Sequence, residues 1–193
     1  MGHSQDEKAE SHELIVRAAA ARFREAGVDG IGVAQLMKEA GLTHGGFYRH
    51  FASRDELVAE AIERALHDGG QRAVGMVAHN AQAPLAALVD GYLSPAHRDH
   101  LASSCAVTTL AGDVARSNDR ARSAYTRQVG TYLELLTRLI ADDEPGPGRT
   151  KAIAALSTLV GALSMARAVN DEKLSREILK SAASELKSQL GVK

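Results

Sequence analysis

The residues best suited to chemistry lie in one stretch, from His44 to Arg54. It carries imidazole, phenol and guanidinium groups and contains no acidic residue. Side chains of these types bind the phosphate oxygens of nucleic acids. The stretch also holds two adjacent glycines, Gly45 and Gly46, each of which costs a helix about 1 kcal/mol relative to alanine. Because glycine lets a backbone come close to another surface, the pattern indicates contact with DNA.

Two short helices must position this stretch. Apolar residues at helical spacing predict the first of them: Val33, Leu36, Met37 and Ala40. Gly41 closes that helix at low cost, because glycine adopts the left-handed conformation. Thr43 is a good N-cap for a second helix over 44–50, which completes a helix-turn-helix. The alternative is an ordinary helical hairpin in which Phe47 and Phe51, four residues apart, belong to the core.

The motif and its flanks resemble the N-terminal domain of TetR-family transcriptional regulators over about residues 10–66. The most specific part is GLTHGGFYRHFASRDEL, which spans residues 41–57. The chain has Arg54 where lysine is commoner in the family, and arginine keeps the positive charge. It also has Ile31-Gly32 where the family usually has Thr or Ser, although glycine is a tolerated N-cap.

The resemblance implies a helix-turn-helix DNA-binding domain at 10–66, with its motif at 32–51, and a ligand-binding and dimerisation domain at 67–193. Four residues are expected to position the protein on phosphates: Thr43, Tyr48, His50 and Arg54. Four are expected to face base edges: His44, Gly45, Gly46 and Arg49. A two-fold dimer would place two such motifs in successive major grooves, about 34–36 Å apart.

Composition indicates the fold class. Hydrophobic residues make up 45% of the 193 residues and aromatic residues 4%, and alanine and leucine dominate, so an all-α protein is expected. The net charge of −1 counts mildly against a nucleic-acid binder, so positive charge must be local. The single cysteine fits a reducing cytoplasm. No stretch approaches 18 uncharged apolar residues, so no membrane span is expected.

Helices are expected along the whole chain, with an N-terminal three-helix domain followed by a C-terminal helical bundle. The first runs from about 9–11 to Ala26 and stops at Gly27, and its Phe23 would join the motif in one core. Ser53 caps the helix after the motif, where Glu56 completes a capping box. Further helices are predicted at 84–93, 103–116, 119–141, 149–169 and 172–190, with a loop at 142–148.

The last two helices carry apolar stripes that suit a dimer. The candidate dimerisation residues are Leu156, Val160, Leu163, Ile178, Ala182 and Leu186. The alternative is a helical pair that covers the core of its own monomer, and amphipathicity does not separate the two. The resemblance favours a four-helix bundle formed by two such pairs across a two-fold axis.

The middle helices would hold an effector, because ligands bind between the helices of a bundle. The candidate ligand-binding residues are Leu101, Cys105, Thr108, Thr109, Tyr125, Tyr132 and Leu163, most of which could equally be core residues. Cys105 is either a thiol that senses electrophiles or oxidants or an inert small hydrophobic residue. His97 and His100 lack a third ligand, so no metal site is predicted and both are expected on the surface.

No catalytic motif points to an enzyme, because the sequence lacks G-x-S-x-G, a P-loop, H-E-x-x-H and a dinucleotide fingerprint. No cofactor is expected. The prediction is a bacterial, cytoplasmic homodimer that binds double-stranded DNA as a repressor and is released by a small lipophilic or aromatic effector. Two alternatives stay open: an effector-binding helical dimer that does not bind DNA, and a transcriptional activator.

Overall fold

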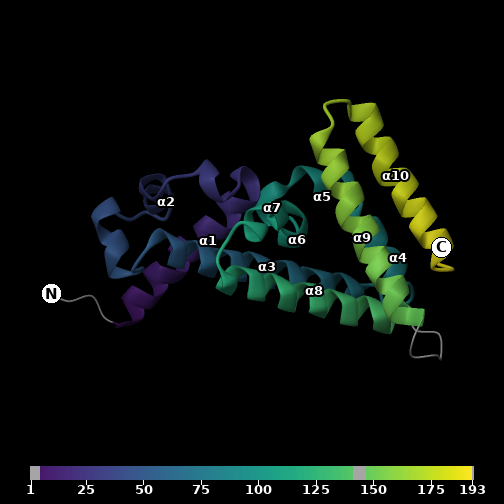
Figure 1. Cartoon of the computed structure of the whole chain (residues 1–193), viewed down its shortest axis with the longest axis horizontal. Helices are drawn as coiled ribbons and strands as arrows, with labels where there is room; N and C mark the ends of the chain where they lie inside the picture. The colour runs from purple at the N-terminus through teal and green to yellow at the C-terminus, as the bar shows by residue number, and fades with distance from the viewer. Residues whose placement is uncertain (1–4, 141–146, 193) are drawn as a thin grey trace.

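The computed structural model describes residues 5–140 and 147–192, in which no strand occurs, so the predicted all-α class is confirmed (Figure 1). The N-terminal helices are α1 (Gln5–Ala26), η1 (Val28–Gly30), α2 (Val33–Glu39), η2 (His44–Arg49) and α3 (Arg54–His79). The remaining helices are α4 (Pro84–Tyr92), α5 (Pro95–Asp99), η3 (Leu101–Ser103), α6 (Ala106–Thr109), α7 (Ala111–Ala115), α8 (Asp119–Ile140), α9 (Pro147–Ala168) and α10 (Glu172–Gln189). Figure 1 shows α1 and α2 at one end of an elongated molecule and α9 and α10 at the other.

The N-terminal end is built around a small core from α1, α2 and η2. Phe23 of α1, Leu36 and Met37 of α2, and Phe47 of η2 each expose 2% or less of their surface and share one buried cluster. Phe51 stacks on Phe47 with ring centroids 5.4 Å apart. As predicted, Phe23 lies in one core with the motif, and the paired rings hold η2 to the helices beneath it.

Glycines end the two helices that precede turns. Gly27 after α1 and Gly41 after α2 both have φ 75°, a conformation that glycine adopts without steric cost. The Gly41 N–H donates to the Lys38 carbonyl at 3.0 Å, and the Leu42 N–H donates to the Met37 carbonyl at 2.8 Å. These two bonds form a Schellman motif, so the predicted stop at Gly41 is confirmed.

Helix α3 connects the N-terminal end to the rest of the molecule (Figure 1). Ser53 caps it, since its Oγ accepts a hydrogen bond from the Glu56 N–H at 3.2 Å. Glu56 Oε2 accepts one in return from the Ala52 N–H at 2.6 Å. The predicted capping box is therefore present, with the return bond one residue earlier than in the usual form. α3 packs against α1 on one side and against α4 and α8 further along.

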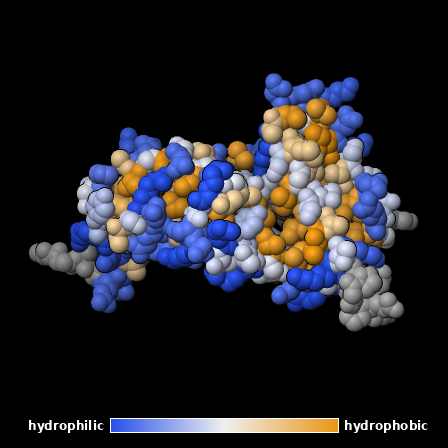
Figure 2. All heavy atoms as spheres, in the orientation of Figure 1, coloured by the Kyte–Doolittle hydropathy of each residue, from blue (hydrophilic) through white to orange (hydrophobic). Residues whose placement is uncertain are grey.

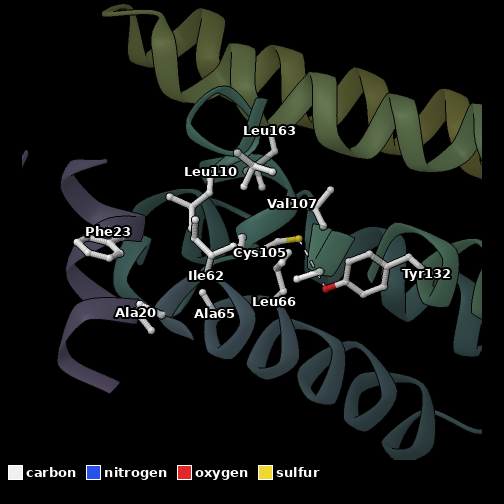
Figure 3. Packing of buried hydrophobic residues seen from close by; sticks show 14 of the residues in the cluster. Ala20, Phe23, Ile62, Ala65, Leu66, Cys105, Val107, Leu110, Tyr132 and Leu163 are labelled. Atoms are coloured by element: carbon white, nitrogen blue, oxygen red, sulfur yellow. Dashed lines mark hydrogen bonds between the residues drawn. The ribbon is translucent and has the colours of Figure 1, made fainter. Parts of the chain in front are cut away.

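The C-terminal core lies among long helices from distant parts of the sequence. Helix α8 runs alongside α3, α9 packs on α8, and α10 packs on α9 (Figure 1). Figure 3 shows Leu110, Leu163 and Cys105 converging from different segments. Leu110 and Leu163 expose none of their surface, and Cys105 exposes 5%.

The helix predicted at 103–116 is wrong, because the chain there forms α6 and α7 after an extended stretch. The backbone at Ser104 is extended, with ψ 169°. The N–H of Cys105 donates to the imidazole of His97 at 3.1 Å. The imidazole of His97 in α5 therefore accepts the hydrogen bond of a backbone N–H at this point. The helix begins only at Ala106.

Two predicted helix starts are also corrected. Helix α1 begins at Gln5, before the expected 9–11. Of the predicted loop 142–148, residues 142–146 lie outside the described residues, and Pro147 and Gly148 open α9. Proline suits the first turn of a helix, because a backbone N–H there would have no hydrogen-bond acceptor within the helix.

Over Gly148–Ala168, helix α9 is long and apolar enough to cross a membrane, judged by length and composition only. Such a test is also met by core helices of globular proteins. In this fold α9 packs between α8 and α10, and its Ala152, Leu159 and Leu163 expose 1% or less of their surface. Part of its apolar character is therefore used in the core.

Removing the cap of α3 should lower stability. We expect Ser53→Ala to reduce the free energy of unfolding in urea by about 1 kcal/mol, because the Glu56 N–H loses its acceptor. Ser181→Ala, at an exposed site within α10, is the matched control and should change it by less than about 0.5 kcal/mol. Equal effects of the two changes would contradict a capping role for Ser53.

Candidate nucleic-acid interface and cavity

The helix-turn-helix is present, but its second helix, η2, is a 3₁₀ helix. The Gly46 N–H donates to the Thr43 carbonyl at 3.0 Å, and the His50 N–H donates to the Phe47 carbonyl at 2.9 Å. Thr43 occupies the predicted N-cap position with an extended backbone, but its side chain makes no capping hydrogen bond. The paired glycines disfavour a regular α-helix, and short 3₁₀ turns are the usual substitute.

The outer side of η2 is an exposed surface. Tyr48 exposes 75% of its surface, and its ring meets that of Phe47 edge-on at 5.2 Å. Exposed with it are Thr43, His44, Gly45 and Arg49, while Gly46 and His50 are half-buried. A Cβ added at Gly45 would meet nothing within 4 Å. Another molecule can therefore approach the backbone here closely, over a helix that its buried phenylalanine holds in place.

His50 reaches from this surface into the interior. Its Nδ1 is buried and has no hydrogen-bond partner among the described residues. Burial lowers the pKa of His50, and the positive charges of His12, Lys8 and Arg49 lower it further. The imidazole is therefore neutral near pH 7, and Nε2 is the nitrogen that can donate to a phosphate.

Arg54 holds the backbone of its own domain. Its Nη2 donates to the Val28 carbonyl at 2.5 Å, and its Nη1 lies 3.5 Å from the Asp29 carboxylate. The Val28 N–H donates in turn to Asp113 of α7 at 3.3 Å. Arg54 thus fixes the turn after α1, and its contact with a phosphate stays a prediction.

A cavity of about 80 Å³ lies between α3, α4, α8 and α9. Its walls are formed by Gly69, Arg72, Ala73, Met76, Leu88, Tyr92, His97, Ser103, Cys105, Tyr132, Leu135, Leu136, Leu156 and Leu159. Two of the predicted ligand-binding residues, Cys105 and Tyr132, are among them. The other five are not: Leu101, Thr108, Thr109, Tyr125 and Leu163.

The five residues outside the cavity wall are held elsewhere. The Thr108 hydroxyl lies 2.6 Å from that of Tyr92, and the Tyr125 hydroxyl donates to the Val107 carbonyl at 2.8 Å. Thr109 bonds the backbone one turn earlier, at the Cys105 carbonyl. Leu163 is fully buried in the core, and Leu101 is half-buried in η3.

Sequence reasoning missed the α3 wall of the cavity, which includes Arg72 and Met76. One signal was present, namely Gly69 in the middle of a helix. A Cβ at Gly69 would lie 3.0 Å from the Tyr132 hydroxyl, which is tighter than an ordinary contact. A glycine that costs helix stability at such a position indicates that another group approaches the helix.

The Tyr132 hydroxyl points at the sulfur of Cys105, 3.7 Å away (Figure 3). Burial raises the pKa of Tyr132 well above its usual value, and the neighbouring Cys105 raises it further. The pKa of Tyr92 is raised for the same reasons. Both phenols therefore stay protonated and can act as hydrogen-bond donors.

The prediction that His97 lies on the surface is wrong. Its Nδ1 lies 2.7 Å from the Tyr92 carbonyl, so Nδ1 carries the proton. Its Nε2 accepts from the Cys105 N–H at 3.1 Å and lies 2.9 Å from Ser104 Oγ. Burial lowers the pKa of His97, and two nearby arginines add to this effect. A neutral imidazole therefore organises this wall of the cavity.

Arg24 connects the N-terminal core to the same wall. Its side chain is 4% exposed, and its Nε donates to the Ala102 carbonyl at 2.7 Å. Its Nη1 donates to the Ala65 carbonyl of α3 at 3.2 Å and lies 4.0 Å from Asp68. Ala102 precedes Ser103, which lines the cavity. The end of α1 and the cavity are therefore joined through one buried guanidinium.

The candidate dimerisation residues divide into two groups. Leu156, Leu163 and Leu186 expose 8%, 0% and 3% of their surface and pack in the core of their own chain. Val160, Ile178 and Ala182 are half-buried. The exposed apolar residues of α9 and α10 are others: Ile153, Met165 and Leu174, at 47%, 55% and 43% exposed. The predicted stripes thus mix the inward face of these helices with their outward face.

Comparisons with known proteins agree with this architecture. Residues 15–61 match the model of the bacterial regulatory proteins of the tetR family. No curated protein matches the chain. A TetR transcriptional regulator from Chloroflexus aurantiacus is similar in structure, with a TM-score of 0.80 and 23% identity over 97% of both chains.

Two further solved structures share the fold. The reduced form of NemR from E. coli is similar with a TM-score of 0.76 and 20% identity, over 93% of this chain and 97% of that one. A TetR-family regulator from Cytophaga hutchinsonii is similar with a TM-score of 0.77 and 14% identity, over 97% of this chain and 98% of that one. The likeness therefore covers the cavity-bearing helices as well as the motif.

Acidification should weaken the fold through His97. Its pKa in the folded protein lies below the ordinary value of 6.5, so below pH 6.5 the unfolded chain binds the proton first. Stability is thus fully present above that pH and falls as the pH drops toward the folded pKa. Urea unfolding between pH 7.5 and 5 should show this loss, with a shallower slope for His97→Gln. His100→Gln, at an exposed site, should keep the wild-type slope, and identical slopes for all three proteins would contradict the assignment.

Proposed function

The chain is a TetR-family regulator by its N-terminal domain and its fold, and from this premise we propose that it is a ligand-released repressor. In this proposal it binds a palindromic operator as a homodimer in the cytoplasm. A small lipophilic or aromatic molecule enters the cavity and releases the operator. The observation that carries the proposal is the exposed face of η2 on a buried aromatic support.

The roles of the η2 surface follow from exposure and chemistry. Tyr48 and Arg49 are exposed and can donate hydrogen bonds to phosphates or bases. His50 offers its Nε2 from a neutral ring. The open backbone at Gly45 allows close approach to the edges of base pairs, and the half-buried Gly46 adds no side chain beside it. Thr43 and His44 flank this surface and complete it.

The outward face of α9 supports a homodimer. Between Lys151 and Arg167 the helix carries no charged residue, although much of it is exposed in one chain. The exposed residues on this stretch are Ile153, Ala154, Ser157, Thr158, Ser164 and Met165. Figure 2 shows hydrophobic residues at the surface where α9 lies. Small residues let helices approach closely, and an uncharged helix face four turns long is typical of a surface covered by a partner.

Release of DNA would follow from the connection at Arg24. A ligand that prefers a wider cavity moves the wall at 102–105, to which the Arg24 guanidinium is bonded. The end of α1 moves with it, and so does the turn held by Asp113 and Arg54. Two motifs in a dimer must match the spacing of successive major grooves. A population with displaced motifs binds the operator less tightly, without any contact between ligand and DNA.

The domain boundary belongs to the proposal as well. Residues 10–66 would form the DNA-binding domain and residues 67–193 the ligand-binding and dimerisation domain. Helix α3 runs through this boundary without a break. The two domains are therefore regions with different tasks that share one helix.

A gel-shift titration tests the proposal, using DNA from just upstream of the protein's own coding region at two salt concentrations. We expect tight, salt-dependent binding that the unlabelled fragment competes away. Tyr48→Ala should weaken binding to all duplexes about fivefold through the loss of one phosphate contact. Its side chain is 75% exposed, so folding should be unaffected.

The matched control is Val74→Ala, at an exposed apolar site in the second half of α3, which should bind as the wild type does. Binding to this fragment no tighter than to random duplex, followed by a genome-wide pull-down without enrichment of any site, would contradict a DNA-binding role. It would favour an effector-binding helical dimer instead. Reporter expression from the bound promoter distinguishes repression from activation.

The homodimer surface is tested by Met165→Glu. Light scattering should show the wild type at twice the chain mass of 20.4 kDa. The glutamate would bury an unpaired charge against the second copy, so the dimer dissociation constant should rise at least about tenfold. Val74→Glu adds the same charge at an exposed apolar residue outside α9 and α10 and should leave the dimer intact. A dimer that tolerates Met165→Glu would place the interface elsewhere.

A further inference from the structure

We infer that the cavity beside Tyr132 binds a small apolar molecule that carries an oxygen hydrogen-bond acceptor, and that it rejects cations. The inference rests on the proposed effector site and names the chemical class of its ligand. It is drawn from which polar groups on the cavity wall are already occupied and which are free to bind.

His97 and Tyr92 are committed within the protein. Both nitrogens of His97 have partners, the Tyr92 carbonyl at Nδ1 and the Cys105 N–H at Nε2. The Tyr92 hydroxyl lies 2.6 Å from that of Thr108. A ligand would have to break the bonds of His97 to use that side chain and would compete with Thr108 for the Tyr92 hydroxyl, so neither is its first partner.

The Tyr132 hydroxyl has a poor partner. Its oxygen lies 3.7 Å from the sulfur of Cys105 (Figure 3), and a thiol is both a weak donor and a weak acceptor. A carbonyl or carboxylate oxygen in the cavity would accept the hydroxyl proton more strongly. Gly69 leaves room for the hydroxyl, because a side chain there would press on it at 3.0 Å.

The charge on the wall selects against cations. Arg72 is exposed and donates one of its N–H groups to the Ser103 carbonyl, which leaves its other donors for a ligand. Among the residues that line the cavity, none is aspartate or glutamate. An ammonium group would therefore lose its water, find no carboxylate there and face the guanidinium. An oxygen acceptor finds two donors, Arg72 and Tyr132, on the wall of the cavity.

The rest of the wall determines the body of the ligand. Apolar side chains from α3, α4, α8 and α9 surround the space, among them Met76, Leu88 and Leu136. The volume of about 80 Å³ is smaller than the ~150 Å³ apolar cavity that holds benzene. The ligand is therefore a short branched or small cyclic molecule, and a larger one requires the flexible Met76 to move.

Methionine-methyl NMR on the full-length protein tests the inference, because Met76 lines the cavity. Met37 in the N-terminal core and Met165 on the outer face of α9 serve as internal controls. Four probes share one branched body: methyl isopropyl ketone, isobutyrate, isopentane and isobutylammonium. We expect the ketone, isobutyrate or both to shift the Met76 signal at millimolar concentration, and isobutylammonium to leave it in place.

Two variants identify which side chain donates the hydrogen bond to a probe. Tyr132→Phe should weaken the oxygen-bearing probes about fivefold and leave isopentane unchanged, because it removes one hydrogen bond. Arg72→Gln should weaken isobutyrate alone, which separates an anionic ligand from a neutral carbonyl. Tyr125→Phe is the control, since its hydroxyl is bonded to the Val107 carbonyl outside the cavity.

The inference is overturned if isobutylammonium shifts Met76 as strongly as the ketone does, or if neither oxygen-bearing probe shifts it. It is also overturned if Tyr132→Phe and Arg72→Gln both leave the oxygen-bearing probes unchanged. If the protein binds its operator in the gel shift but no probe shifts the Met76 signal, the ligand class is wrong and the proposed repressor still stands. A Met76 response in a protein that binds no DNA defeats the proposed repressor and leaves the ligand class standing.

Discussion

The position of the exposed η2 surface depends on the packing of α1 against α3. Leu57, Ala61 and Ala65 of α3 expose none of their surface, and the two alanines allow the helices to approach closely. The His12 imidazole of α1 lies 2.7 Å from the Glu60 carboxylate of α3 at the edge of this contact. Because α3 is one continuous helix from Arg54 to His79, the helix that packs against α1 also forms a wall of the cavity further along.

A second attachment makes this packing sensitive to the C-terminal domain. α1 is held at its end by Arg24, whose bonds reach both α3 and the Ala102 carbonyl. The turn that follows is held by Asp113. Burying a guanidinium costs free energy unless its hydrogen bonds are satisfied, so small shifts of these carbonyls carry a large penalty. Movement at the cavity wall and movement of α1 are therefore hard to separate.

The motif could be predicted from sequence because its signals are local. Gly41 forms the expected helix stop, and Ser53 and Glu56 form the expected cap. What failed depended on contacts across the fold. His97 is half-buried and bonds the Cys105 N–H eight residues later, and no periodicity reports such a contact. Leu163 and Leu186 were assigned to a dimer surface, since an apolar stripe does not say which side of a helix faces its own core.

The wall of the cavity overlaps only in part with the residues predicted to bind a ligand, for a related reason. Cys105 and Tyr132 could be chosen by residue type, while Arg72 and Met76 lie on α3, none of whose residues is a predicted ligand contact. Gly69 is a residue of α3 whose type indicates the packing of this helix against α8, because the Tyr132 hydroxyl of α8 approaches the helix there. A site assembled from four helices leaves little evidence on any one of them.

The buried arginine at the end of α1 has a consequence for how such proteins diversify. A new operator preference could arise by exchange of the N-terminal domain between relatives. In this chain the exchange would cut through α3 and would need an arginine at 24 that fits the carbonyls of Ala65 and Ala102. In the proposed function, recognition of DNA and recognition of a ligand would thus be inherited together, and each would change only through substitutions that the other tolerates.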